Sequence, residues 1–445
     1  MKRLAAALLL VIACKSARTT GSASAADATA SSAVESRMAA ADAGSGACGG
    51  AVCAHGQFPP ASWRPYSSNS PFNRKVPANP RLMAKSELIV ERLLGDLSRH
   101  KQPANLAVYD DGTGGWPTYW GTPADPLYAV SCKWGDCSAA HLKGHAPAGA
   151  EIQGGNEAAK DESHDRHLTF IDQTTSTEFD LWHVAISPLP GGGGTIATDW
   201  AGITKIDGDG LSGCAGGVCR GEGNAGRVGN LAGRVRFEEL ADASARRSYV
   251  EHALAITIRC TDGTTVYPAS TNSGMPCTDA AAHTPKGNRY APPMGARLHL
   301  NLTRSGAAAD LAHIDGKAMS RVPEWKKVFL RTLVVYGAIV MDTGTDFYFA
   351  WQTESGNQYT SMKVSDPWLG FARGMTINAA TGKPHTDCWT GPPATDFQVD
   401  CQQDPKGPGD GYLGVWHEKD DGLDWNGQVW SHLEVLHECV SKGTC

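Results

Sequence analysis

The sequence predicts a mainly-β fold, with a β-sandwich or jelly-roll-like core and two to three covering helices. Short apolar runs are separated by Gly-, Pro- and Asp-rich turns, including HLTFID, EFDLWHVAIS, HALAITIRC, RLHLNL, GAIVMD and DFYFAWQ. These runs do not alternate regularly with helical patterns, which disfavours a doubly wound parallel sheet. The chain has 445 residues, 41% of them hydrophobic, and is therefore long enough to bury a large core.

Three segments are predicted to be helices. Within residues 84–99, apolar side chains recur at the spacing of one helix face. A second helix is predicted over residues 231–246. The third covers residues 324–336; Pro323 is suited to its start and Gly337 to its end.

The N-terminus has the pattern of an export signal. Lys2 and Arg3 precede an apolar run that ends at Ala13 and is too short to cross a membrane, so residues 1–13 are predicted to be a signal peptide. The run leads into VIAC, which resembles the lipobox of bacterial lipoproteins and implies lipidation of Cys14.

The expected location follows from this signal. Residue 15 is Lys rather than the Asp that resembles an inner-membrane retention signal. We therefore expect a cell-envelope lipoprotein of the outer membrane or cell surface, held at the membrane by its lipid. A plain secretory signal cleaved after Ala23 or Ala26 would instead give a secreted protein.

The rest of the chain is expected to have two regions. Residues 14–47 are predicted to be the lipidated cysteine and a flexible linker, because residues 15–47 are mostly Ala, Ser, Thr and Gly and have few large apolar side chains. Residues 48–445 are predicted to form a single β-rich domain. An irregular insertion is expected around residues 354–420, pinned by Cys388 and Cys401.

The cysteines favour disulfides in an oxidising compartment. Of the 13 cysteines, twelve remain when Cys14 is set aside, and four pairs have only four or five residues between them. Zinc is the competing interpretation, but zinc knuckles usually use closer spacing and bring two such pairs together.

Residues 164–183, HDRHLTFIDQTTSTEFDLWH, predict a β-hairpin with a four-residue turn at 173–176. Pairing Asp172 with Thr177 separates the two faces, because side chains alternate along a strand. The apolar face then holds Leu168, Phe170, Phe179 and Leu181. The polar face holds His167, Thr169, Glu178, Asp180 and Trp182.

The polar face of this hairpin is the predicted catalytic site. The backbones of Glu178 and Asp180 lie roughly 7 Å apart on one strand, so their carboxyl groups can perturb each other's pKa. We expect Glu178 to be the main catalytic carboxylate, Asp180 to tune it, and His167 to transfer protons. Trp182 is expected to stack on a sugar ring. A solvated polar face without function is the alternative.

Further substrate-binding residues are predicted on two other strands. In RLHLNL, the leucines point one way while Arg297, His299 and Asn301 point the other and extend a polar face. Arg297 is expected to hold substrate together with Trp182, and His299 to assist it. His252 is in phase with an apolar stripe, so it is either a substrate contact or a hydrogen-bonded core residue.

Other kinds of site are disfavoured. The net charge is −6 and no cluster of Lys and Arg is present, which argues against nucleic acid. No metal site is expected from His164 and His167, because three residues apart on a strand places them on opposite faces. No cofactor is predicted. DGDG at 207–210 and DWNG at 424–427 resemble fragments of calcium loops, which leaves structural calcium open, although turns account for both.

Several segments resemble, in order, a broad family of secreted proteins of bacteria and some fungi. They are NSPFNRKVPANPRL, APAGAEIQGGN followed by HDRHLTFID, GNLAGRVRFEEL, YVEHALAITI, PPMGARLHLNL and VFLRTLVVYGAIVMDTGTDFYFA. This resemblance covers roughly residues 68–351 and implies one exported domain, without an activity. EFDLWH also resembles the E-x-D-x-E strand of jelly-roll β-glucanases, but Trp182 stands in place of the third carboxylate.

These features predict an exported carbohydrate-active protein whose partner is a polysaccharide. The leading hypothesis is cleavage by carboxylate and histidine acid–base chemistry, as a hydrolase or a lyase. The alternative is a non-catalytic glycan- or envelope-binding surface lipoprotein, which needs Trp182 but not the titration of Glu178. A third hypothesis, an acid peptidase, rests on the same carboxylates.

Overall fold

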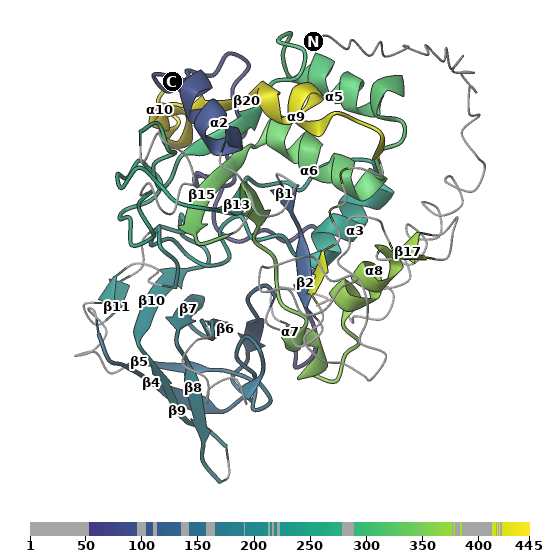
Figure 1. Cartoon of the computed structure of the whole chain (residues 1–445). Coiled ribbons are helices and arrows are strands. Elements are labelled where there is room, and N and C mark those ends of the chain that lie inside the picture. The colour runs from purple at the N-terminus through teal and green to yellow at the C-terminus, as the bar shows by residue number, and fades with distance from the viewer. Residues whose placement is uncertain are drawn as a thin grey trace, which may run out of the picture.

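The computed structural model describes residues 53–95, 104–109, 114–134, 142–156, 165–190, 192–211, 214–215, 218–219, 223–277, 289–345, 347–375, 377–378, 383–384, 412–414, 416, 418 and 421–445. The predicted signal peptide, Cys14, the linker, His164, Cys388 and Cys401 lie outside these residues. Figure 1 shows a part with one large sheet and most of the helices, and below it a part built from two smaller sheets.

The large sheet is mixed and has six strands. Its order is β1 (Ala104–Asn105), β16 (Phe349–Trp351), β13 (Leu254–Ile258), β15 (Ala338–Thr343), β14 (Arg297–Leu300) and β20 (Leu433–Leu436). Strands β1 and β16 are parallel, as are β13 and β15, whereas the other neighbours are antiparallel. The central strands β13 and β15 are mostly Ile, Val, Leu and Ala, as expected for strands buried on both faces.

Helix α6 (Glu324–Val335) is the central helix of this part and packs on β14, with α3 (Phe237–Ala245) and α5 (Ala307–Asp315) beside it. All its residues from Trp325 to Val335 are buried. Three of its charged side chains are paired: Lys326 contacts Asp421 at 2.6 Å, and Arg331 contacts Glu324 and Asp315 at 2.5 Å each. These ion pairs allow a helix with charges on its surface to lie in the core.

The remaining helices are shorter or lie at the edges of the structure. Helix α2 (Ser86–Gly95) packs on β20. The others are η3 (Lys317–Met319), α7 (Asn357–Thr360), α8 (Pro367–Met375), α9 (Trp425–Gln428), η5 (Trp430–His432) and α10 (Glu438–Lys442). The three predicted helices are confirmed as α2, α3 and α6, except that residues 231–236 of the second predicted helix precede α3 and are not helical. Of residues 354–420, where an irregular insertion is expected, the described ones include helices α7 and α8.

The smaller part is a sandwich of two four-stranded sheets. One sheet has the order β10 (Trp200–Lys205), β7 (Thr177–Trp182), β6 (Leu168–Asp172) and β3 (Thr118–Gly121). The other has the order β5 (Leu142–His145), β4 (Leu127–Cys132), β9 (Gly194–Thr198) and β8 (Ala185–Pro188). Apolar side chains from both sheets form one core, in which the rings of Phe170 and Phe179 stack at 4.4 Å. Gly144 lies against this pair, since a Cβ there would lie 2.7 Å from each ring.

Three two-stranded ladders complete the described strands: β11 (Cys214–Ala215) with β12 (Val218–Cys219), β17 (Ile377–Asn378) with β18 (Lys383–Pro384), and β19 (Tyr412–Gly414) with β2 (Ala107–Tyr109). The predicted mainly-β fold with covering helices is therefore confirmed. The sandwich is confined to the smaller part, because the six-stranded sheet packs against helices.

Disulfides are present among the described cysteines. Cys260 bonds to Cys277 and Cys439 bonds to Cys445, and Cys53 and Cys132 are also disulfide-bonded. The prediction of disulfides is confirmed for these six residues. In the described part of the chain, no helix has both the length and the apolar character needed to cross a membrane.

Candidate functional site

The predicted register of the hairpin is confirmed for β6 and β7. Asp172 pairs with Thr177, Phe170 with Phe179, and Leu168 with Leu181. Strand β10 covers the other edge of β7 and pairs Trp200 with Trp182. Strand β7 is thus an interior strand whose polar face runs from Glu178 through Asp180 to Trp182.

The Glu178 carboxylate is fully buried and held by two donors. The Tyr66 hydroxyl donates to its Oε2 at 2.6 Å, and the backbone N–H of Leu231 donates to its Oε1 at 2.8 Å. The chain passes very close to this contact at Gly229, where a Cβ would lie 2.0 Å from the tyrosine oxygen. Glycine is therefore required there for the segment to approach the carboxylate.

Asp180 is also fully buried and is held from the same segment. The N–H of Asn230 donates to its Oδ2 at 3.1 Å, and the Thr169 hydroxyl donates to its Oδ1 at 3.2 Å. The Asn230 side chain donates in turn to that hydroxyl at 3.2 Å. The two carboxyl groups are thus covered by residues 229–231, which the sequence places far from the hairpin.

The two carboxyl groups titrate together, and both have a raised pKa. Burial raises the pKa of Glu178 and Asp180, and the neighbouring Glu178 raises the pKa of Asp180 further, well above its ordinary value. A hydrogen bond between the two side chains links their titrations. Two like charges so close in a dry interior are unfavourable, so one group retains its proton.

Arg234 supplies the positive charge that faces this pair. Its Nη1 donates to the carbonyl of Trp116 at 3.2 Å and to the Thr118 hydroxyl at 2.7 Å. The guanidinium is buried and lies 5.1 Å from the Trp116 ring centroid. Its charge lowers the pKa of both carboxyl groups and opposes the effect of burial. One ionised carboxyl group and one guanidinium leave the interior close to neutral.

His167 is buried beside this network. Its ring stacks on Trp116 at 4.1 Å, and burial lowers its pKa to about 4. The imidazole is therefore neutral at physiological pH. Its Nδ1 makes no hydrogen bond, so His167 is not aligned to exchange a proton with either carboxyl group.

The structure therefore places the three predicted catalytic residues in one region but buries them away from solvent. Glu178 and Asp180 have no exposed surface, and His167 is only 4% exposed. The carboxyl oxygens of Glu178 and Asp180 accept hydrogen bonds from Tyr66 and from residues 230–231, which connect the sandwich to the larger part of the molecule. This arrangement favours a structural network over a catalytic centre for these residues.

Trp182, the last residue of the same face, is accessible. Its ring stacks on His183 at 3.7 Å, and its Nε1 donates to Asp165 Oδ1 at 3.2 Å. His183 Nδ1 lies 3.0 Å from Asp199 Oδ2, and its side chain is 17% exposed. The indole and imidazole thus stack face to face, so that each ring covers one face of the other, and two carboxylates contact their ring nitrogens. This stacked pair is one part of an aromatic surface.

This surface continues onto two further tryptophans. Lys133 lies 3.9 Å from Asp199 and 4.1 Å from the ring centroid of Trp134, which is 44% exposed. The Trp134 ring in turn lies 6.1 Å from that of Trp200, the cross-strand partner of Trp182. We call these seven residues the tryptophan surface: Trp134, Trp182, Trp200, His183, Asp165, Asp199 and Lys133.

Arg297 does not extend this face, because β14 belongs to the six-stranded sheet. Its buried guanidinium donates to the carbonyls of Tyr336 at 2.8 Å, Arg74 at 2.5 Å and Pro71 at 3.4 Å. Burial lowers its pKa to about 9. The side chain fixes residues 71–74 to the sheet and is not available to a substrate.

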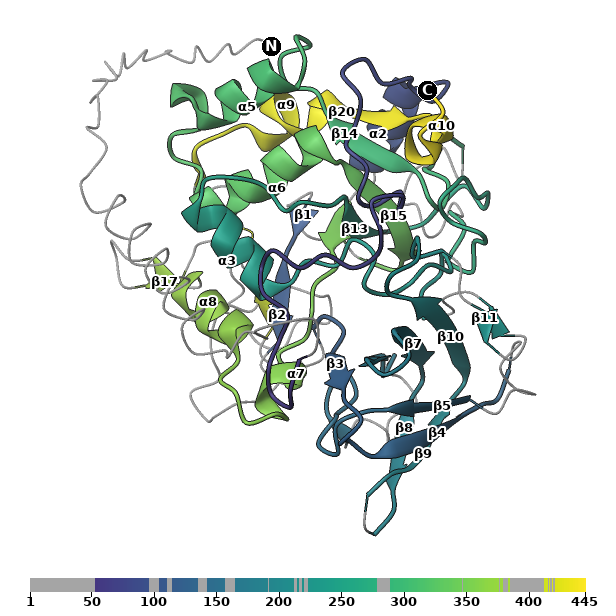
Figure 2. The ribbon, with the colours of Figure 1, turned by 180° about the vertical axis from the view of Figure 1, so that it is seen from behind.

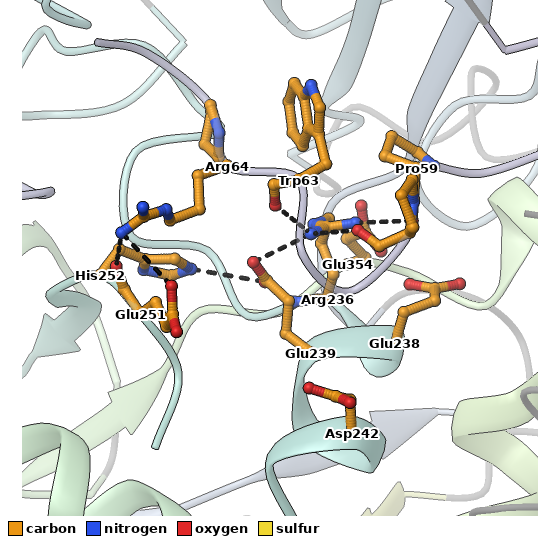
Figure 3. A network of polar contacts seen from close by, with 12 residues as sticks. Pro59, Trp63, Arg64, Arg236, Glu238, Glu239, Asp242, Glu251, His252 and Glu354 are labelled. Carbon is orange, nitrogen blue, oxygen red and sulfur yellow. Dashed lines mark hydrogen bonds and ion pairs between the residues drawn. The ribbon is translucent and has the colours of Figure 1, made fainter. Parts of the chain in front are cut away.

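His252 belongs to another buried network, shown in Figure 3. Its Nε2 lies 3.4 Å from Glu239 Oε2, and its Nδ1 lies 2.9 Å from the carbonyl of Ala253. Glu239 pairs with Arg236 at 2.9 Å, and Arg236 donates to the carbonyls of Pro59, Pro60 and Trp63 at 2.9, 3.3 and 2.7 Å. The alternative interpretation of His252 as a hydrogen-bonded core residue therefore fits the structure.

His299 lies away from the hairpin, in a cavity formed beside β14, α5 and β20. The structure thus distributes the seven predicted site residues outside the signal segment over five places. Among the described residues, no group of three His, Cys, Asp or Glu side chains is arranged to bind a metal.

Several residues of the tryptophan surface and of the buried network have weak sequence signals. His183 and Asp165 lie at the ends of the hairpin, and Trp134 and Trp200 each occur singly in polar segments. Arg234 and Asn230 lie in GNLAGR, where a glycine-rich turn gives no reason to expect a buried contact. The 13 tryptophans of the chain were the available signal for an aromatic surface.

No family model, no curated protein and no solved structure matches this chain.

Proposed function

We propose that this protein binds glycan at the tryptophan surface and does not cleave it with Glu178. Three indole rings lie next to polar side chains on one accessible edge of the sandwich, while the carboxyl pair on the same strand is buried. The contrast between accessible Trp182 and inaccessible Glu178 carries this proposal.

The chemistry of the surface suits a sugar polymer. Indole faces stack on the C–H faces of sugar rings, and exposed aromatic rings are costly to leave in water. His183, Asp199 and Lys133 supply donors and acceptors for hydroxyl groups between the rings. The surface lies along strand ends and is accessible at its edge, which suits a chain rather than a small enclosed ligand.

The binding role is tested with polysaccharides of plant, algal and microbial origin. Affinity electrophoresis and pull-down of the full-length protein should identify at least one polysaccharide ligand. Trp182→Ala and Trp134→Ala should each weaken its binding about tenfold, because stacking of a ring contributes roughly 1–3 kcal/mol. Leu189→Ala is the matched control: Leu189 is 63% exposed on the same sandwich and is not part of the surface.

The same samples distinguish binding from cleavage. We expect no new reducing ends and no unsaturated uronate absorbance, and we expect Glu178→Gln to bind as well as the wild type. Product release that is abolished in Glu178→Gln would restore the hydrolase or lyase hypothesis and contradict the binding role. Casein digestion at acidic pH would instead support the acid peptidase.

The lipid anchor at Cys14 remains part of the proposal, because it would present the surface to envelope or external polymers. Cys14→Ser should move the protein from the membrane pellet to the soluble fraction without unfolding it. A variant that stays in the pellet would contradict anchoring through this residue.

A further inference from the structure

A cavity of about 570 Å³ lies at the opposite part of the molecule from the tryptophan surface. It is bounded by the extended segment 76–82, the end of β14, the start of α5 and β20. Figure 2 shows α5, β14 and β20 together at the top, and the sandwich strands at the bottom. The cavity is therefore a separate candidate site with its own chemistry.

One side of the cavity is built around Glu434. Asn301 Nδ2 donates to its Oε1 at 3.0 Å, and His299 Nδ1 lies 3.6 Å from its Oε2. Burial alone would raise the pKa of Glu434, but its contacts with His299 and Asn301 outweigh burial and lower it. The carboxylate is therefore ionised, and its side chain remains 23% exposed.

The imidazole leaves an unsatisfied group on this side. His299 Nε2 lies 3.1 Å from the carbonyl of Val334, which can only accept, so this nitrogen carries the proton. The other ring nitrogen, Nδ1, faces the Glu434 carboxylate. The Nδ1 atom is buried and makes no hydrogen bond, and 3.6 Å is too long for one.

Two more acceptors line the same cavity. Asp310 is fully buried; its Oδ1 accepts from Thr303, while its Oδ2 makes no hydrogen bond. The Asn301 side chain uses its N–H₂ group toward Glu434, which leaves its oxygen as an acceptor. The Glu434 carboxylate and the Asn301 oxygen beside it match a primary ammonium group, which has three donors and a positive charge.

The other side of the cavity is positive. Arg304 is exposed at the rim, and its charge acts on Glu434. It is followed by the first turn of α5, whose N-cap residue, Gly306, provides no side-chain cap. That turn already contains the Asp310 carboxylate, so the exposed arginine is the group on this side that favours an anion such as a carboxylate.

We propose that this cavity binds a small zwitterion, with a primary ammonium on the Glu434 side and a carboxylate on the Arg304 side. Free α-amino acids have this arrangement. The wall made by Val76, Pro77, Pro80 and Val334 provides an apolar surface for a short side chain. Among the described residues, no Phe, Tyr or Trp lines the cavity, which distinguishes it from the proposed glycan surface.

Calorimetric titration of the full-length protein tests this inference. The probes are L- and D-alanine, L- and D-lysine, ethylamine, acetate and glucose, each to about 10 mM, which detects millimolar affinity. We expect at least one amino acid to bind. Ethylamine and acetate, each with only one of the two charges, should bind at least about tenfold more weakly.

Two variants assign the two charged sides. Glu434→Gln and Arg304→Ala should each weaken amino-acid binding about tenfold or more, since each removes one charge-assisted contact. Arg247→Ala is the matched control, because Arg247 is also exposed and has a positive φ of 53°, close to the 56° of Arg304. Its binding should equal that of the wild type.

Three results would overturn the inference: no heat with any amino acid, glucose binding equal to that of the amino acids, or amino-acid binding unchanged in both variants. Thermal unfolding of each variant shows that the protein is folded in the titration. Trp182→Ala should leave amino-acid binding unchanged, so this experiment is independent of the glycan proposal.

Discussion

The two ends of one face of β7 have opposite environments. At one end, Glu178 and Asp180 are fully buried beneath residues 229–231 and Tyr66. At the other end, Trp182 lies at an accessible edge and contacts Asp165 and His183. Strand periodicity assigns these side chains to one face, but the segment that packs on the face decides which of them meets solvent.

This difference changes the expected role of each residue. A buried carboxyl pair with a facing guanidinium binds two parts of the molecule together, and removing one charge leaves the others unpaired. An accessible indole contributes less to stability and more to recognition. We call the end of β7 with Glu178 and Asp180 the closed end, and the end with Trp182 the open end. The comparison therefore predicts that substitutions reduce stability strongly at the closed end and weakly at the open end.

The largest effect is expected for Arg234→Met, which removes the buried cation and leaves the carboxyl pair without its positive partner. We expect the free energy of unfolding to fall by about 3–5 kcal/mol in urea denaturation. Lys143→Met is the control, because Lys143 is exposed on β5 of the same sandwich, and it should change stability by less than about 0.5 kcal/mol. A loss below about 1 kcal/mol for Arg234→Met would show that this network is not a stabilising core.

Much of the fold could be predicted because its signals are local. The hairpin register follows from the alternation of Leu168 and Phe170 with polar residues and from a turn of four residues. Helix α6 follows from Pro323 and Gly337 at its two ends. The residues that set register and helix ends are neighbours in the sequence, so their pattern is visible there.

The closure of the site could not be predicted because its contacts are long-range. Leu231 donates to Glu178 across 53 residues, and Tyr66 does so across 112. The cavity has the same origin, since Asn301 and Glu434 are 133 residues apart. No periodicity relates such segments, and a polar strand face has the same pattern whether it meets solvent or another polar segment.

A smaller loss is expected for Tyr66→Phe. The change deletes one hydroxyl and leaves Glu178 Oε2 without its 2.6 Å donor, while the ring can stay packed. An unsatisfied buried acceptor costs about 1–3 kcal/mol, so the free energy of unfolding should fall by that amount. Tyr128→Phe serves as the control in the other sheet of the sandwich and should cost less. Equal losses in the two variants would show that the hydrogen bond from Tyr66 to Glu178 does not contribute to the free energy of unfolding.

The pH dependence of stability includes a contribution from the carboxyl pair, beside those of other buried carboxyl groups with a raised pKa, such as Glu354 and Asp342. The pKa of Asp180 is raised in the folded state, so folding retains a proton that the unfolded chain releases near its ordinary pKa of about 4. This contribution is fully present below that pKa and is lost as the pH rises toward the folded value. The free energy of unfolding should thus fall with pH by up to about 1.4 kcal/mol per pH unit from this group.

Asp180→Asn should remove this slope, because an amide does not titrate. We would measure urea unfolding of the wild type and the variant between about pH 5 and pH 8, where ordinary carboxyl groups are already ionised. Exposed Asp207 provides the control, and Asp207→Asn should keep the wild-type profile. Parallel profiles for Asp180→Asn and the wild type would contradict a proton held at the closed end.

The smallest effect on stability is expected at the open end, for Trp134→Ala. The Trp134 ring is 44% exposed and lies 6.1 Å from that of Trp200, so its removal opens no cavity in the sandwich core. The free energy of unfolding should change by less than about 0.5 kcal/mol, as for other surface substitutions. Binding of a polysaccharide ligand should still weaken about tenfold, because the ring is a stacking platform. A variant that loses stability but keeps binding would reverse the comparison, since the exposed indole would then serve the fold and not recognition.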